Sequence, residues 1–191
     1  EKPYVLVRIS DEHAKSWADA LGLTVRRCYV SDSIVTAKAI EHGVDKTEII
    51  AARLPDPGST MAGDFGEILV YLYQGAKDLA AFGPKKWRLK QDRTKPAPHS
   101  DVLQFVLPTW PTASDQDVLR CAEVKTKSTS ADSKPIQSAI EDSAKDRTSR
   151  LARTLVWLRE RALVESLGDV QLAHLDDIVE REAAAHQVVG A

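Results

Sequence analysis

The chain is poor in aromatic residues and in cysteine, and it lacks any apolar run long enough to cross a membrane. Aromatic residues are only 6% of its 191 residues, so base stacking is not expected to dominate any recognition of nucleic acid. The two cysteines, Cys28 and Cys121, lie far apart and lack metal-ligand spacing, which favours a reducing, cytoplasmic compartment over a disulfide scaffold. No apolar stretch approaches the roughly 18 residues of a membrane span, and no signal peptide is visible.

The remaining composition is typical of a folded domain. Hydrophobic residues make up 43% of the chain and charged residues 28%, with a formal net charge of -2, so a surface that binds a polyanion has to be local. The length suits one α/β core with a small attached lobe. The chain begins at Glu1 instead of Met and ends soon after the apolar pair Val188 and Val189. We therefore expect it to be trimmed at both ends.

A cluster of helix and strand breakers, Leu54–Ser59, divides the chain into two parts. The elements expected before it alternate between strand and helix: Tyr4–Ile9, Asp11–Leu21, Arg26–Val30 and Ser33–His42. The sequence therefore predicts an N-terminal α/β lobe over residues 1–58.

The pattern over residues 59–191 is helix, three strands and helix. Five apolar residues lie on one face of the first helix: Phe65, Ile68, Leu69, Leu72 and Ala76. The three strands are expected over Lys86–Gln91, Asp101–Leu107 and Val118–Val124. The segments Ile136–Leu167 and Leu172–Ala185 are expected to be largely helical. The sequence thus predicts a three-layer α/β core with its sheet in the middle.

A spaced set of charged residues lies on this core. Glu67 is on the first helix, Asp101 begins one strand, and Glu123 and Lys125 lie near the end of the next. Two acids on neighbouring strands can hold a divalent cation, and a lysine two residues after an acid projects from the same strand face. We expect the Asp101 and Glu123 carboxylates on one sheet face, about 3–6 Å apart. This arrangement would activate water against a phosphodiester.

The set resembles the motif of the PD-(D/E)XK nuclease superfamily. That superfamily has a core of helix, three-stranded meander, helix and strand. It carries an acid on the first helix, an Asp near the start of the second strand and Glu-X-Lys on the third. The matching positions here are Glu67, Asp101, Glu123 and Lys125. The fourth core strand is a departure, because it is missing or begins only near Val188.

The resemblance implies a nuclease that uses Mg²⁺, with Mn²⁺ as an alternative. Asp101, Glu123 and the main-chain carbonyl of Val124 would supply three oxygen ligands. Glu67 would hold a second ion or orient a metal-bound water. Lys125 would sit beside the nucleophilic water and the developing negative charge.

Within the superfamily, three segments resemble the nuclease subunits of Hachiman anti-phage systems: Gly63–Leu69, Pro84–Trp87 and Glu123–Lys127. This resemblance covers roughly residues 50–165. It implies a DNA substrate and a role as effector of a defence complex. It also implies a helicase partner, encoded alongside, that restrains the nuclease until it is needed. Residues 1–58 are the candidate contact with that partner.

A basic cluster lies beside the expected site. Six positive residues fall between Lys85 and Lys95 against Asp92 alone. Such clusters bind phosphate without sequence specificity. The residues expected to contact nucleic acid are Lys85, Lys86, Arg88, Lys90 and Lys127. The alternative is a solvated charged face.

Each acid also has a structural alternative. Asp64 and Glu67 have the spacing of a helix capping box. Asp101 could simply begin a strand after a turn, and Glu123 with Lys125 could be the charged face of an exposed strand. At the level of function, the alternatives are a nucleic-acid-binding scaffold subunit with a degenerate site, and a metal-free module that binds a protein partner.

Overall fold

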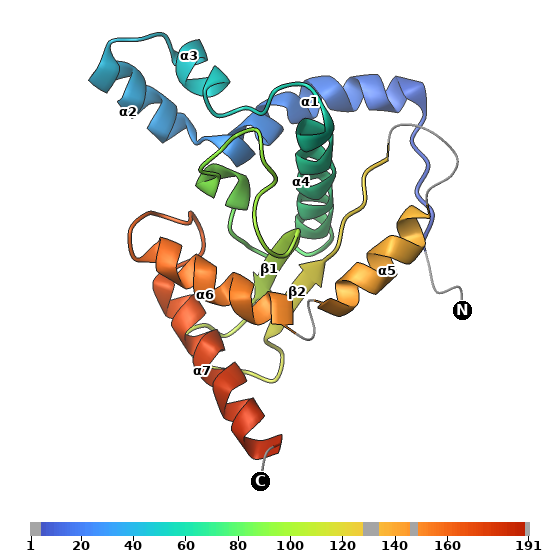
Figure 1. Ribbon diagram of the computed structural model, residues 1–191, viewed down its shortest axis with the longest axis vertical. Helices are drawn as coiled ribbons and strands as arrows, with labels where there is room; N and C mark the ends of the chain where they lie inside the picture. Colours follow the sequence, from blue (N-terminus) through green and yellow to red (C-terminus); the bar gives the residue numbers. More distant parts are fainter. Residues whose placement is uncertain (1–4, 128–133, 146–148, 190–191) are drawn as a thin grey trace.

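The computed structural model describes residues 5–127, 134–145 and 149–189, with the backbone alone from residue 182. It is a mixed α/β structure in which helices surround one small sheet (Figure 1). The first four helices are α1 (Asp11–Tyr29), α2 (Asp32–His42), α3 (Lys46–Ala51) and α4 (Ser59–Lys77). The short 3₁₀ helix η1 (Lys86–Leu89), strands β1 (Val102–Val106) and β2 (Val118–Ala122), and helices α5 (Pro135–Lys145), α6 (Leu151–Ala162) and α7 (Leu172–Val189) follow.

The sheet is an antiparallel hairpin of β1 and β2, with Val102 opposite Ala122 and Val106 opposite Val118. Phe82 adds a single bridge beside β1, because its amide and carbonyl exchange hydrogen bonds of 3.0 and 2.7 Å with those of Phe105. The expected three-stranded meander is therefore represented, within the described residues, by two strands and one bridge.

The strand expected over Lys86–Gln91 is wrong, because these residues begin as η1 and continue irregularly. The Lys86 and Trp87 side chains, which a strand would send to opposite faces, both reach the buried Glu67. Tertiary hydrogen bonds to one carboxylate thus override the local alternation.

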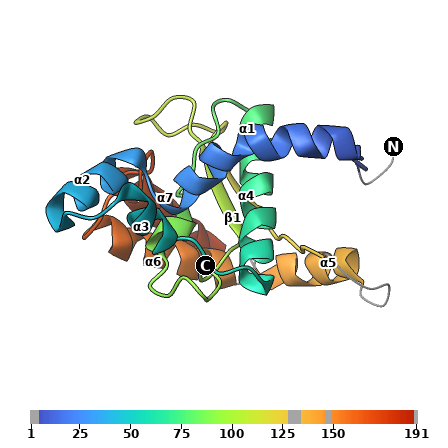
Figure 2. The same cartoon turned by 90° about the horizontal axis from the view of Figure 1, so that it is seen from above.

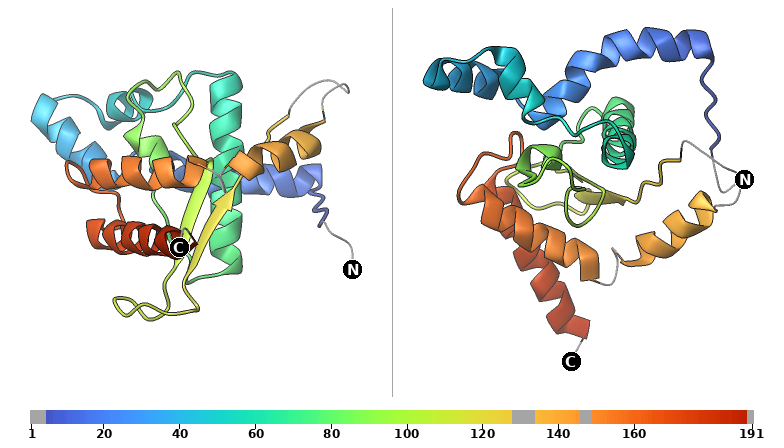
Figure 3. Two further views of the ribbon diagram at one scale, coloured as in Figure 1. Left: turned by 60° about the horizontal axis from the view of Figure 1, so that its bottom comes forward. Right: turned by 45° about the horizontal axis from the view of Figure 1, so that its top comes forward.

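The two faces of β1 pack against different helices, as the alternation of a strand requires. Leu103 and Phe105 point into a core whose other members include residues of α6 and α7: Leu155, Leu158, Leu175 and Ile178. Val102 packs with Ile68 and Tyr71 of α4, and the Gln104 side-chain amide donates to the Tyr71 carbonyl at 3.1 Å. The hairpin consequently lies between α4 and α6 (Figure 3).

The described part of residues 1–58 is helical, so the α/β lobe expected there is wrong. Val5–Ile9 is irregular and exposed, and no strand of the described ranges pairs with it; Tyr4 lies outside the described residues. Arg26–Val30, the other expected strand, is the end of α1 and its C-cap. Cys28 and Tyr29 are buried there with residues of α4, and this packing favours continuing the helix.

The expected helices of this segment are confirmed and are explained by their caps. The Ser10 side chain accepts from the His13 amide at 3.3 Å, and Ser31 accepts from Ile34 in the same way. Gly43, with φ of 65°, ends α2 in the left-handed conformation. The breaker cluster Leu54–Ser59 falls between α3 and α4, with Ser59 as the first residue of α4, and the division of the chain into two domains there stays a prediction.

Helix α1 makes few contacts along its first half, whose residues 11–20 are all exposed. It extends from the body of the molecule on the same side as α5 (Figures 1 and 2). None of the helices in the described ranges is long and apolar enough to span a membrane.

Gly83 should be intolerant of a side chain. A Cβ atom there would lie 2.3 Å from the Leu103 carbonyl oxygen, beside the bridge that joins Phe82 to the sheet. We expect Gly83→Ala to lower the free energy of unfolding by about 1–3 kcal/mol, measured by urea denaturation.

Gly22→Ala is the matched control, because nothing lies within 4 Å of a Cβ atom at this position inside α1. It should raise stability by about 0.5–1 kcal/mol through helix propensity. Equal stability of Gly83→Ala and the wild type would contradict the close approach.

Candidate acidic site at the end of the hairpin

Asp101 and Glu123 lie at the same end of the hairpin. The last pair of the ladder is Val102 with Ala122, and Asp101 and Glu123 are the residues just beyond it on the two chain segments. The negative charge of Glu123 contributes to the raised pKa of Asp101, so the two acids are near each other, and their placement on one sheet face stays a prediction. The Asp101 carboxylate also accepts a hydrogen bond from the Val124 amide at 2.8 Å, which fixes it against the end of β2.

Both oxygens of Glu123 are paired with cations. The Lys125 ammonium lies 2.6 Å from Oε1, and the Arg150 guanidinium, at the start of α6, lies 2.5 Å from Oε2. The Glu123 side chain is only 4% exposed. The charge of Glu123 is therefore balanced inside the protein. The alternative that Glu123 belongs to an exposed charged face of a strand is wrong.

Lys125 has a second anionic partner in Asp142 of α5, 2.6 Å away. The hydrogen bonds to Asp142 and to Glu123 raise the pKa of Lys125 well above its ordinary value. Conversely, the hydrogen bonds from Lys125 and Lys145 lower the pKa of Asp142 to about 2. Lys125 is thus a charged ammonium held between the hairpin and α5.

Glu67 approaches from α4 and is buried. One of its oxygens accepts from the Trp87 indole at 3.0 Å and lies 3.2 Å from the Lys86 ammonium. Burial raises the pKa of Glu67 to about 7; Lys86 opposes this shift, and the nearby negative charge of Asp101 adds to it. The capping-box alternative is wrong, because the N-cap of α4 is Gly58.

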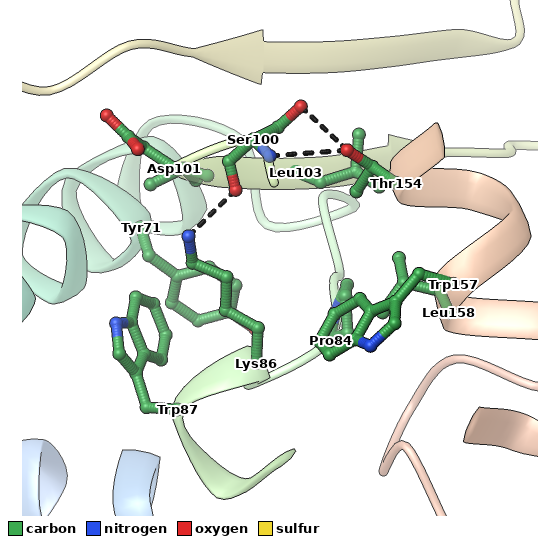
Figure 4. Close-up of a pocket in the computed structure, with 11 residues that line it drawn as sticks. Tyr71, Pro84, Lys86, Trp87, Ser100, Asp101, Leu103, Thr154, Trp157 and Leu158 are labelled. Carbon is green, nitrogen blue, oxygen red and sulfur yellow. Dashed lines mark hydrogen bonds between the residues drawn. The ribbon is translucent and has the colours of Figure 1, made fainter. Parts of the chain in front are cut away.

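Asp101 is electrostatically linked to both other acids. Burial raises its pKa, the Val124 amide and Lys86 oppose that rise, and Glu123 adds to it. Lys86 donates to the Ser100 carbonyl at 2.8 Å (Figure 4). Asp101 and Lys86 both line a small cavity of about 10 Å³, room for about one water molecule. The Asp101 carboxylate points away from Trp157 on the far wall (Figure 4).

The basic cluster of η1 is largely engaged within the fold. Lys86 is buried against Glu67. Lys90 and Asp64 form an ion pair of 2.7 Å whose side chains are 4% and 1% exposed. Arg88 donates two hydrogen bonds to the Arg27 carbonyl, at 2.6 and 3.1 Å. These cations join η1 to α1 and α4.

The two other expected nucleic-acid contacts are more open. Lys85 is half-buried, and Lys127 is exposed beyond the end of β2. Contact with nucleic acid stays a prediction for all five residues. Lys127 and Lys85 are more accessible to a nucleic acid than Lys86, Arg88 and Lys90, whose side chains have partners within the fold.

Two residues that contact this site were not expected from the sequence. Arg150 and Asp142 lie on the helices that follow β2. Their partners, Glu123 and Lys125, precede them by 27 and 17 positions, so no local spacing indicates the pairing. Packing of α5 and α6 beside the hairpin brings them in.

The donor set fits a divalent cation in its chemistry. Among the residues described, no three His, Cys, Asp or Glu side chains are grouped closely enough to hold a metal. Mg²⁺, however, commonly takes one or two carboxylates and keeps several waters, and Asp101 with Glu123 supplies such a pair. Lys125 and Arg150 neutralise the Glu123 carboxylate. A metal bound to Glu123 would neutralise the same charge.

Fold and site together define a mixed α/β protein whose small hairpin carries acids and a lysine at one end. A family model for HamA matches residues 2–189. The chain therefore belongs to the HamA family and has a role in Hachiman anti-phage defence, which confirms the Hachiman resemblance. Searches of curated proteins and of solved structures each gave no match.

The raised pKa of Glu67 predicts a pH-dependent stability. The folded-state pKa of about 7 lies above the unfolded value of 4.5. The folded state therefore favours the protonated acid, and this contribution is complete below pH 4.5 and is lost as the pH rises through 7. Between pH 4.5 and 7.5, the wild type should lose about 2 kcal/mol of unfolding free energy relative to Glu67→Gln, measured by urea denaturation.

Glu160→Gln, which removes an exposed carboxylate from α6, is the control for that comparison. Parallel pH profiles for the wild type and Glu67→Gln would show that burial does not shift the pKa of this acid.

Proposed function

We propose that this HamA-family chain is a PD-(D/E)XK nuclease that hydrolyses DNA with Mg²⁺, or with Mn²⁺ in its place. The observation that supports the proposal is the end of the hairpin, where Asp101 and Glu123 follow the last pair, Val102 and Ala122, and the Lys125 ammonium lies 2.6 Å from Glu123. An acid pair with an adjacent lysine can hold a divalent cation and stabilise the charge that develops on a phosphodiester during hydrolysis.

Each residue has a distinct part in this proposal. Asp101, Glu123 and the Val124 carbonyl would hold the cation, and Glu67 would hold a second ion or orient a water molecule. A cation bound there would supply a lower pKa for water and polarisation of the phosphate. Lys125, which its partners keep protonated, lies beside the negative charge that develops on the phosphate.

The DNA contacts are expected to be made with the backbone. Lys127 follows Lys125 by two residues and is exposed, so it is placed to meet a phosphate next to the site. Such contacts give affinity without sequence readout. The chain shows no motif that reads base edges in the major groove.

Variants of the site should abolish cleavage without unfolding the protein. We expect Glu123→Gln and Lys125→Ala to reduce nicking of plasmid DNA in Mg²⁺ by at least ~100-fold, because these groups serve the transition state. EDTA should have the same effect on the wild type. Lys38→Ala, which removes an exposed lysine paired with Glu41 on α2, is the control and should cleave normally.

Thermal unfolding of each variant distinguishes a catalytic role of Glu123 and Lys125 from a structural one. Loss of activity that only follows loss of folded protein would assign Glu123 and Lys125 a structural role and would refute the catalytic one.

A scaffold subunit with a degenerate site is the second candidate. It is favoured by the cation pairing of both Glu123 oxygens, because a closed ion-pair network is complete without metal. A folded wild type that binds DNA but does not cleave it in Mg²⁺ or Mn²⁺ would support this candidate.

We also propose that a helicase partner restrains the nuclease, since unregulated cleavage without sequence readout would damage the host. Two open hollows of about 420 and 390 Å³ adjoin each other along α1 and α4, and both are lined by Val25 and Phe65. Trp17 is 41% exposed and Phe65 is 44% exposed at this surface. Exposed apolar surface of this kind suits a protein partner.

The restraint predicts different cleavage by the free chain and the complex. After co-expression with the neighbouring helicase, the purified complex should cleave plasmid DNA at least ~10-fold more slowly than the chain alone, and Trp17→Arg should weaken the complex. Ile40→Arg is the control, because Ile40 is 78% exposed on α2 and lies outside both hollows. Equal cleavage in both states, or failure to form a complex, would refute restraint.

A further inference from the structure

Trp157 of α6 lies between the acidic site and a second, open hollow. It lines the small cavity that Asp101 also lines (Figure 4). It also lines a hollow of about 270 Å³, which is near the lower limit of small-molecule sites, about 300 Å³. This space therefore suits one small planar group. We call it the Trp157 hollow, and its walls include Trp157, Leu89, Lys95, Pro96, Pro98 and Arg161.

The indole N–H of Trp157 has no hydrogen-bond acceptor in the part of the chain that the structure describes. It is not one of the buried polar atoms that lack a partner, so it reaches solvent. The Trp87 indole, by contrast, donates to Glu67 at 3.0 Å inside the protein. Trp157 thus packs partly against the core while its polar edge stays open to a ligand, a combination typical of tryptophans at binding surfaces.

A second aromatic ring connects Trp157 to the acidic site. The His99 ring lies beside the indole, with ring centroids 5.4 Å apart and planes inclined by 50°. His99 precedes Asp101 by two residues. Its φ of 69° is in the left-handed region, which is uncommon for residues with a side chain and recurs at functional sites.

Positive charges flank Trp157 on both sides. Arg153 and Arg161 are one turn before and one turn after it on α6, about 6 Å along the helix axis in each direction, so the three side chains share one helix face. Arg153 is exposed, and Arg161 and Lys95 line the hollow together with Asp92. The ion pairs of Arg161 and Lys95 are long, 3.4 and 3.6 Å. Such pairs contribute little, so both cations are available to a phosphate.

We propose that the Trp157 hollow binds one unpaired base of a DNA strand, stacked on the indole, while Arg153, Arg161 and Lys95 contact the neighbouring phosphates. This inference rests on the proposed nuclease function and names its substrate as DNA with unpaired bases next to the cleaved bond. A base inside a duplex has both faces covered by its neighbours, whereas an unpaired base can stack on an aromatic side chain. The Asp101 carboxylate points away from Trp157 (Figure 4), so the stacked base would flank the scissile phosphate.

The first test compares two labelled single strands with the wild-type chain in EDTA, where metal-dependent cleavage is blocked. One strand has about 12 thymidines, within the usual site size, and the other has the same sugars and phosphates without bases. Fluorescence anisotropy should show at least ~5-fold weaker binding of the abasic strand, because it cannot stack. Equal affinity for the two strands would refute stacking.

Trp157→Leu removes the aromatic face and keeps an apolar side chain against the core. It should weaken binding of the thymidine strand by at least ~5-fold and leave binding of the abasic strand within about twofold. An equal loss for both strands would mean that Trp157 acts through the fold, and would refute the stacking role.

Trp110→Leu is the matched control for this variant. Trp110 is also a half-buried tryptophan beside a histidine ring, 4.4 Å from His174, but it lies between β1 and β2, outside the Trp157 hollow. It should leave both affinities within about twofold of the wild type. A loss specific to the thymidine strand in Trp110→Leu would contradict the placement of the base at Trp157.

Arg153→Gln tests the phosphate contacts. It should weaken binding of both strands equally, by about threefold, and reduce the salt dependence of binding. Arg159→Gln is its control, because Arg159 lies two residues from Trp157, on the opposite face of α6, and is paired with Asp176. Equal weakening by both variants would show a general effect of charge and refute the contact by Arg153.

These outcomes are separate from those for the nuclease. Cleavage of DNA by a wild type that binds both strands equally refutes the base site and leaves the nuclease. Trp157-dependent binding of the thymidine strand by a chain that cleaves no DNA in Mg²⁺ or Mn²⁺ refutes the nuclease and leaves the hollow as a DNA-binding site. If Trp157→Leu does not fold, the comparison of the two strands by the wild type decides.

Discussion

Acids that this chain buries have to meet a positive charge or a hydrogen-bond donor, because an ionised carboxylate without a partner is strongly disfavoured in the interior. Asp64 meets Lys90, and Glu67 meets Lys86. Both acids lie on α4 and both lysines lie in or next to η1. The two pairs thus join α4 to a segment far along the chain, and they account for the compact 3₁₀ turn there.

The same requirement acts at the end of the hairpin, but with a different outcome. Glu123 meets one cation from its own strand segment and another from α6. The pairs of Asp64 and Glu67 lie within the packed body, whereas the Glu123 partners are 22% and 32% exposed. The charge of Glu123 is therefore balanced by cations that are themselves partly open to solvent, and this distinguishes the acidic site from the two pairs inside the body.

The helical N-terminal segment joins the rest of the molecule through apolar contacts, in contrast to the charged site. Its contact with the rest of the molecule is made mainly by the end of α1, where Cys28 and Tyr29 are buried, while the first half of the helix is exposed. The apolar hollows between α1 and α4 lie on the helix that also carries Glu67. A partner bound at these hollows would therefore contact an element of the site itself.

Local signals were sufficient to predict the helices of α1, α2 and α4, the break at Leu54–Ser59 and both strands of the hairpin. Caps, breakers and apolar periodicity act within a few residues, and the Asp101 and Glu-X-Lys positions follow from strand alternation. The same signals failed for Val5–Ile9, which pairs with no strand among the described residues, for Arg26–Val30, which continues α1, and for Lys86–Gln91, where contacts with Glu67 override the alternation. Arg150 and Asp142 reach the site only because α5 and α6 pack beside the hairpin. The sequence by itself determined the first part of α1, the helices α2 and α4, the hairpin and the acids that it carries. Only the tertiary structure decided which cation neutralises each acid, because burial and long-range packing set those pairings.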